Sequence, residues 1–132
     1  MKTLEVRTRS RTELIDITSK VRSAISDSGV RDGIAVVFVA HTTAAVTINE
    51  SADPAVPADI IEKLSELVPR NGSYRHAEGN SDAHVKSSLI GSSINLIVSQ
   101  GSPVLGTWQG IFFCEFDGPR NRKVVVKVVP AG

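Results

Sequence analysis

Short apolar blocks alternate with polar segments along most of this chain. Residues 3–8 alternate strictly, which predicts a half-buried strand with Leu4 and Val6 facing inward. Residues 33–40 are apolar throughout, a pattern typical of a central strand that is covered on both faces. Richness in Val, Ile, Thr and Phe predicts further strands over residues 14–17, 45–49, 93–99, 107–116 and 123–129. We expect 34–40 and 45–49 to form a hairpin, and the last two strands to pair across a turn at 117–121.

Apolar residues at helical spacing predict two longer helices and one short helix. The first begins near Asp16 or Thr18, either of which suits an N-cap, and ends at Gly29. The second begins at Asp53-Pro54 and carries an apolar stripe of Ile60, Ile61, Leu64, Leu67 and Val68. Asp82 is expected to cap the short helix over residues 83–90. Together these elements predict a single α+β domain over residues 1–132, mostly antiparallel, with about six strands and two or three helices.

Composition narrows the class of protein. The 132 residues include 15 Lys+Arg and 14 Asp+Glu, so the net charge of +1 argues against a basic nucleic-acid binder. No apolar run approaches the roughly 20 residues that span a bilayer, and the N-terminus lacks the apolar core of a signal peptide. Cys114 is the only cysteine, which rules out an intrachain disulfide and a Cys-rich zinc cluster. We therefore expect a cytoplasmic protein without a membrane or nucleic-acid partner.

The chain has only three histidines, and each is expected at the edge of an element. His41 follows the apolar strand, His76 lies in the long polar stretch 69–82, and His84 falls in the first turn of the short helix. The helix dipole disfavours the imidazolium at that place, so His84 is expected to be neutral. Three neutral imidazoles around one divalent ion form a coherent zinc hypothesis. The alternative is that they are ordinary polar residues of turns and solvated loops.

Other polar residues are candidates for a site, each with a structural alternative. Glu50 and Asp53 suit acid–base chemistry or the capping of a helix. Trp108 suits a core strand or a flat wall for a heteroaromatic ligand, with Gln109 as its hydrogen-bonding neighbour. The 117–123 turn carries three cations, which suit phosphate or carboxylate groups but also an ordinary solvated hairpin tip. The common nucleotide-binding, serine-hydrolase and zinc-protease motifs are absent.

These clusters, in this order, resemble the YjbQ-type family, also named secondary thiamine-phosphate synthase. The likeness covers nearly the whole chain. The motifs that carry it are His41-Thr42-Thr43-Ala44, Ile48-Asn49-Glu50, Ala52-Asp53-Pro54, His76, Glu78-Gly79-Asn80, Ala83-His84-Val85-Lys86, Gly106-Thr107-Trp108-Gln109-Gly110-Ile111 and Glu115-Phe116-Asp117-Gly118-Pro119-Arg120.

The resemblance implies a β-sandwich-like α+β fold, a compact homotrimer and a His-rich pocket near the subunit boundaries. His41, His76 and His84 would be ligands of a divalent metal there. Zinc is expected because imidazoles favour it, with magnesium as the oxygen-preferring alternative. The other expected site residues are Glu50, Asp53 and Lys86 as catalytic groups, and Asn49, Trp108, Gln109, Arg120 and Arg122 as substrate-binding groups.

The family name implies a transferase that joins a pyrimidine diphosphate to a thiazole phosphate and releases pyrophosphate. Cations must then hold the growing negative charge, a role for Lys86, Arg120 and Arg122. Two alternatives stay open at this point. One is a zinc-dependent hydrolase of a small anionic substrate with Glu50 as general base. The other is a non-catalytic module that binds a small ligand or a metal.

Overall fold

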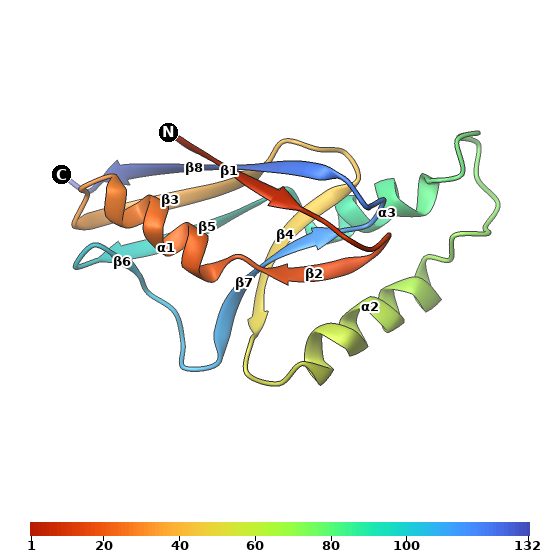
Figure 1. Cartoon of the computed structure of the whole chain (residues 1–132), viewed down its shortest axis with the longest axis horizontal. Helices are drawn as coiled ribbons and strands as arrows, with labels where there is room; N and C mark the ends of the chain where they lie inside the picture. Colours follow the sequence, from red (N-terminus) through yellow and green to blue (C-terminus); the bar gives the residue numbers. More distant parts are fainter.

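The computed structural model describes all of residues 1–132 and contains eight strands and three helices (Figure 1). Both termini lie at the same end of the molecule, and α3 lies at the other (Figure 1). In chain order the elements are β1 (Lys2–Arg7), β2 (Glu13–Asp16), α1 (Thr18–Asp27), β3 (Asp32–Val39), β4 (Ala44–Glu50), α2 (Ala55–Leu67), α3 (Ser81–Ile90), β5 (Ser93–Ser99), β6 (Ser102–Pro103), β7 (Gln109–Glu115) and β8 (Asn121–Pro130).

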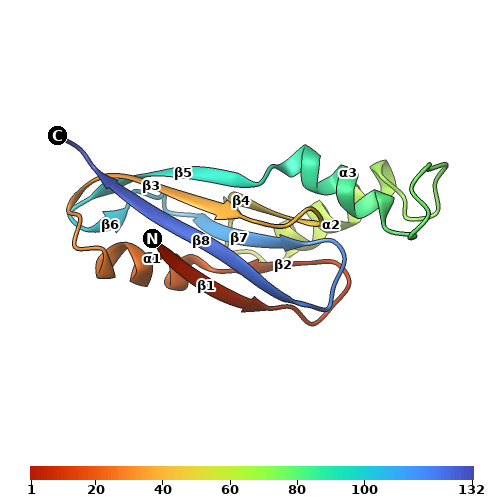
Figure 2. The same ribbon diagram turned by 90° about the horizontal axis from the view of Figure 1, so that it is seen from above.

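The strands form two antiparallel sheets. The larger sheet has the order β1-β8-β3-β5-β6, and the smaller has the order β2-β7-β4. We call them sheet A and sheet B. Every strand pairing is antiparallel, which confirms the mostly antiparallel α+β fold. Figure 2 shows α3 and the long loop before it extending beyond the end of both sheets.

Sheet B carries apolar side chains on both of its faces. In β7, Ile111 and Phe113 join the main core of 16 buried residues, which also contains residues of sheet A and of α1. Cys114 and Phe116 point the other way, into a second cluster with Ala83 of α3. This alternation along one strand follows the two-residue period of side chains in a sheet. Sheet B is therefore packed between sheet A on one side and the α2–α3 region on the other.

Two of the predicted strand pairings are wrong. β3 pairs with β5 and β8 in sheet A, whereas β4 pairs with β7 in sheet B, so these neighbours in sequence do not form a hairpin. Likewise β8 pairs with β1 and β3 and not with β7. The physical reason is burial on two faces, because β4 and β7 are apolar on both sides and need a second layer over each. The chain therefore crosses from one sheet to the other at both turns.

The outer face of sheet A carries an uncovered apolar patch along β3 and its two neighbouring strands, interrupted by the exposed Asn95 and Lys127. Ile34 and Phe38 of β3 are 52% and 43% exposed, and Ile97 and Val129 beside them are 64% and 50% exposed. The prediction that residues 33–40 are covered on both faces is therefore not met within one chain. The stripe on α2 is also incompletely covered, since no residue between Ala55 and Leu67 is buried. None of the three helices is long and apolar enough to cross a membrane.

Candidate functional site

All three histidines lie at the end of the molecule where α3 begins, at the right of Figure 1. His41 belongs to the β3–β4 connection, His76 to the loop before α3, and His84 to the first turn of α3. His41 and His84 line one open depression with Thr42, Ala44, Ser87, Ser88, Gly91 and Ser92. Two imidazoles and several hydroxyl groups therefore face the same space.

One side of α3 builds a wall of this depression. His84, Ser88 and Gly91 follow each other at the spacing of one helix face, and Ser87 lies beside them. The Ser87 hydroxyl is buried and has no hydrogen-bond partner within the chain. Buried polar groups are rarely left unpaired, so this hydroxyl is a candidate to form a hydrogen bond with a molecule bound in the depression.

The opposite side of α3 is anchored by buried charges. Asp82 is fully buried and accepts hydrogen bonds from both terminal nitrogens of Arg11, at 3.2 and 3.0 Å, and from Lys86 Nζ at 3.1 Å. Burial alone would raise the pKa of Asp82, but the hydrogen bonds from Arg11 and Lys86 outweigh it and lower that pKa. Asp82 thus fixes the helix and does not act as the predicted N-cap. Lys86, predicted as a catalytic cation, has its ammonium group engaged here and 2% exposed.

A second buried ion pair lies under the β3–β4 connection. Arg122 of β8 forms a two-pronged contact with the Glu115 carboxylate, with Nε at 2.9 Å from Oε1 and Nη2 on Oε2. Arg122 Nη2 also reaches the Thr43 hydroxyl at 2.9 Å, and the Thr8 hydroxyl donates to Glu115 at 2.7 Å. Burial would raise the pKa of Glu115, but the bonds from Arg122 and Thr8 lower it. Arg122, predicted to bind substrate, therefore joins the two sheets through β7 and β8.

Burial and a neighbouring backbone N–H determine the protonation and tautomer of His41. The backbone N–H of Lys123, next to Arg122, donates to His41 Nε2 at 2.9 Å. Burial and then the positive charge of Arg122 lower the pKa of His41 below its ordinary 6.5, so the ring is neutral at pH 7. A neutral imidazole that accepts at Nε2 carries its proton on Nδ1. His41 thus has a hydrogen-bond donor, and no free lone pair, on its remaining nitrogen.

A polar chain fixes His76 in a different way. Arg120 donates to the Asp117 carboxylate at 2.8 Å, and Asn80 Nδ2 donates to the same oxygen at 2.9 Å. The Asn80 amide is thereby oriented with its oxygen toward His76 Nε2, at 2.9 Å. Since an amide oxygen only accepts, His76 Nε2 carries a proton, and Glu78 Oε2 lies 3.6 Å from the same nitrogen. Arg120, predicted to bind substrate, holds this chain in place from the β7–β8 turn.

The three histidines do not fit a three-imidazole metal site within one chain. His76 and His84 meet edge to face, with ring centroids 5.2 Å apart. His41, however, has Nε2 occupied by Lys123 and its proton on Nδ1. No group of three or more His, Cys, Asp or Glu side chains is placed to hold a metal ion in this structure. The ligand set implied by the resemblance is thus reduced to His76 and His84 here.

The remaining predicted site residues belong to or adjoin the other end of sheet B, where β4 ends and β7 begins, at the bottom of Figure 1. Glu50 pairs with Gln109 in the β4–β7 register, whereas Ala44, near His41, pairs with Glu115. Ala44 and Glu50 are six positions apart, which corresponds to roughly 20 Å along β4. One chain therefore does not bring Glu50 to the histidines.

The same far end contains Asn49, Asp53 and Trp108. Asp53 Oδ1 accepts from the backbone N–H of Ala55 at 2.9 Å, as expected of a residue at the start of a helix. Asn49 Oδ1 accepts from the neighbouring backbone N–H, and Gln109 Oε1 accepts from that of Gly106. Trp108 is 62% exposed and thus not a core residue. These residues form a separate polar surface, and their predicted roles in a site stay predictions.

Several residues that organise the histidine end were not singled out from the sequence. Thr8 and Arg11 reach the buried charges from segments distant in sequence, and so does Thr43, which belongs to a motif of the resemblance but was given no role. One signal was present, because Glu115 is charged within the otherwise apolar strand 111–116, where a lone carboxylate needs a partner. Cys114 is buried as expected, and burial raises the pKa of its thiol to about 12.

Comparison with known proteins agrees with this fold along the whole chain. The family model described as UPF0047 protein YjbQ-like matches residues 2–131. The chain belongs to this family. The UPF0047 protein MJ1081 of Methanocaldococcus jannaschii is 59% identical over 125 residues, covering 95% of this chain and 91% of that protein. The UPF0047 protein YugU of Bacillus subtilis is 47% identical and covers 98% of both chains.

Solved structures of YjbQ-like proteins share the fold. A crystal structure of an uncharacterized conserved protein of the YjbQ/UPF0047 family from Clostridium acetobutylicum has a TM-score of 0.96 and 53% identity, covering 98% of this chain and 100% of that one. A protein of unknown function from Sulfolobus solfataricus has a TM-score of 0.94 and 35% identity, covering 98% and 96%. These YjbQ-like relatives establish the family and the fold, and their descriptions assign no activity.

Replacing Glu115 by Gln tests the buried ion pair. Because the Arg122 charge then loses its partner in a dry environment, we expect the free energy of unfolding at pH 7 to fall by about 3–5 kcal/mol. The control Glu66→Gln removes a carboxylate that pairs with Lys63 at the surface, and should cost less than about 1 kcal/mol. Urea denaturation measures both, and equal losses in the two variants would contradict the assignment.

The free energy of unfolding should also depend on pH, and differently in the wild type and in Glu115→Gln. The lowered pKa of Glu115 means that its stabilisation is present above pH 4.5, its ordinary value, and is lost as the pH falls through the lower folded value. Wild-type stability should therefore drop more steeply than that of Glu115→Gln on acidification. Parallel curves of unfolding free energy against pH would show that Glu115 titrates normally.

Proposed function

We propose that this protein is an enzyme for a small anionic substrate, bound in the depression between His41 and His84. The observation that carries this proposal is the unpartnered, buried Ser87 hydroxyl beside two imidazoles, one of which, that of His41, is held neutral mainly by burial. A histidine side chain with a free ring nitrogen is the usual group for proton transfer, and His84 is that side chain here.

The two imidazoles offer complementary groups to a substrate. His41 offers Nδ1–H as a donor, because Nε2 is occupied by Lys123. The side chain of His84 forms no hydrogen bond within the chain, so one ring nitrogen is available as a proton acceptor. The Ser87 hydroxyl adds a donor for a phosphate oxygen, whereas the Ser88 hydroxyl already donates to the His84 carbonyl at 3.0 Å. This arrangement supports proton transfer at a bound, phosphorylated molecule.

Within this frame we propose diphosphate displacement as the reaction to test first. The resemblance implies that a pyrimidine diphosphate loses pyrophosphate and is joined to a thiazole phosphate. Lys86 and Arg122 are engaged with carboxylates, so they act here as positioning residues and not as cations for the leaving group. Arg120 also pairs with a carboxylate, that of Asp117, but its side chain is 54% exposed, so it is the most accessible of the three cations for the leaving group.

A metal is not part of this proposal. The zinc or magnesium expected from the resemblance would find only His76 and His84 with suitable nitrogens, and His41 does not fit. The alternative hydrolase with Glu50 as base also loses its support, since Glu50 lies at the other end of β4. Hydrolysis of the pyrimidine diphosphate without formation of thiamine phosphate is therefore one possible result of the activity test.

The activity test uses the purified protein with the pyrimidine diphosphate and the thiazole phosphate. We expect thiamine phosphate and pyrophosphate in equal amounts, and a loss of roughly 10²-fold or more in rate for His84→Ala. Glu62→Ala on the exposed side of α2 serves as control and should keep the wild-type rate. Pyrophosphate without thiamine phosphate would indicate hydrolysis, and a background rate with both substrates would overturn the transferase.

We also propose that the uncovered outer face of sheet A meets other copies of the chain in a homotrimer. The apolar pattern of residues 33–40 is that of a strand buried on two sides, yet Ile34 and Phe38 are exposed in the single chain. An exposed apolar patch of this kind is typical of an interaction surface. The number of copies follows from the family resemblance.

A double variant tests the assembly. Ile34 and Ile97 are partners in the β3–β5 register, so Ile34→Lys with Ile97→Lys places two charges at the middle of the face. We expect wild-type sedimentation at three times the chain mass of 14.1 kDa and the double variant at one. Leu67→Lys, at a residue of α2 that is 70% exposed and lies outside sheet A, should leave the trimer intact. A monomeric wild type would contradict the proposal.

A further inference from the structure

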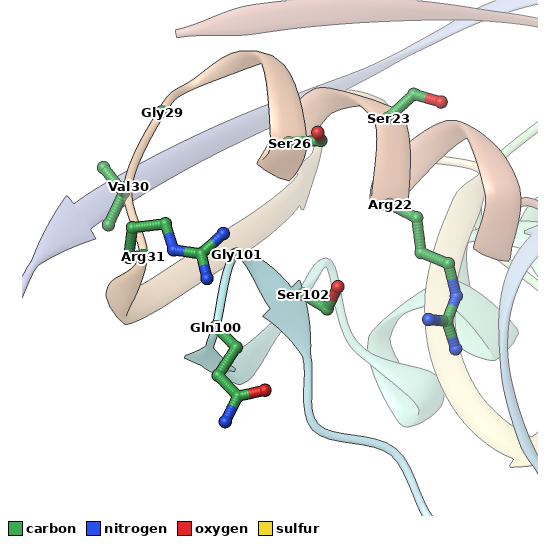
Figure 3. Close-up of a pocket in the computed structure, with 9 residues that line it drawn as sticks. All are labelled: Arg22, Ser23, Ser26, Gly29, Val30, Arg31, Gln100, Gly101 and Ser102. Carbon is green, nitrogen blue, oxygen red and sulfur yellow. The ribbon is translucent and has the colours of Figure 1, made fainter.

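A second depression (Figure 3) lies at the end of the molecule that carries both termini and β6, opposite to α3 (Figure 1). It is formed by α1, by the connection from α1 to β3, and by the turn between β5 and β6. Its volume of about 370 Å³ is in the range of small-ligand sites. The nine lining residues are Arg22, Ser23, Ser26, Gly29, Val30, Arg31, Gln100, Gly101 and Ser102, and none of them is acidic.

The two arginines are without carboxylate partners. Neither Arg22 nor Arg31 takes part in an ion pair of this chain. The nearby Asp27 pairs with Lys2 at 3.6 Å and does not line the depression. Figure 3 shows Arg22 and Arg31 on either side of Ser102. The depression therefore has two uncompensated positive charges and three serine hydroxyls.

The wall that carries Arg31 is held in place by the backbone. Gly101 donates its N–H to the Arg31 carbonyl at 3.0 Å, which ties the α1–β3 connection to the β5–β6 turn. A Cβ atom on Gly101 would lie 3.3 Å from Arg31 Nη1, so the glycine leaves room for the guanidinium over the turn. In the same turn Gln100 has a φ of 53° and is the one non-glycine residue with positive φ in the chain. A non-glycine residue rarely adopts this conformation, so the hydrogen bond to the Arg31 carbonyl helps to hold the turn in its shape.

The C-terminal end of α1, where the helix dipole is negative, repels an anion only weakly. Backbone N–H groups of Ser28 and Gly29 already bond to the last carbonyls of the helix, those of Ala24, Ile25 and Ser26. The negative end of the helix dipole is therefore partly neutralised where it faces the depression.

We infer that this depression is a binding site for the phosphate group of a small phosphorylated compound, separate from the histidine site. Two guanidinium groups and three hydroxyls offer more donors than a carboxylate can accept, whereas the three terminal oxygens of a phosphate match them. Guanidinium groups bind phosphate oxygens in a two-pronged geometry, which lysine cannot reproduce. The site is distant from His41 and His84, so it binds its ligand independently of the proposed reaction.

The test is an NMR titration of the full-length protein at constant ionic strength, with inorganic phosphate in one arm and glycerol 3-phosphate in the other. We expect saturable shifts of the Gly101 and Ser102 amides, with a dissociation constant on the order of 1 mM or lower. Stronger binding of the ester would identify an organic phosphate as the ligand, and equal binding would identify free phosphate. Either result supports the site.

Two matched variants decide whether the arginines are responsible. Arg22→Gln with Arg31→Gln should weaken binding at least roughly tenfold, as expected for the loss of charge-assisted hydrogen bonds. Arg9→Gln with Arg70→Gln removes the same charge from exposed positions outside the depression and should leave the binding unchanged. The absence of saturable shifts at Gly101, or equal weakening in both double variants, would overturn the inference. Binding that persists in His84→Ala separates this site from the histidine depression.

Discussion

The ion pair between Glu115 and Arg122 is the constraint on which the histidine end depends. It lies where sheet B meets sheet A, since Glu115 ends β7 and Arg122 belongs to β8. A charge buried there without a partner would be very costly. The end of β7 and the start of β8 must therefore lie side by side, although the two strands do not pair. The same guanidinium binds Thr43, and the next backbone N–H binds His41. One buried pair thus joins the two layers and orients an imidazole at the surface.

Much of the fold could be predicted from the pattern of apolar residues. The three helices and the longer strands lie within a few residues of their expected positions, because their periods and end signals are local. The sheet pairings were missed because two hairpins that look natural in the sequence are crossings between sheets. What decides this is burial on both faces of β4 and β7, which depends on residues far away in the chain. β6, with two residues, was too short to show a pattern.

The site was predictable only in part. Polar residues at strand and helix ends led to the three histidines, and His41 and His84 share a depression. Their chemistry could not be read from the sequence, because the proton on His41 is determined by a backbone N–H more than eighty positions away. Lys86 and Arg122 looked like free cations, although each has a buried carboxylate partner only four and seven positions away, because the sequence does not show which charged residues are buried. Glu50 and Trp108 share motifs with the family, but β4 and β7 carry them to the opposite end of sheet B.

Burial and the Lys123 backbone N–H leave His41 neutral, with its proton on Nδ1 as a hydrogen-bond donor. The most direct measurement is a neutron crystal structure of the protein at neutral pH, which locates the exchangeable hydrogen atoms. The account predicts a single deuterium on Nδ1 of His41, with Nε2 accepting from the Lys123 amide. A deuterium on Nε2, or a metal ion bound to either nitrogen of His41, would contradict it.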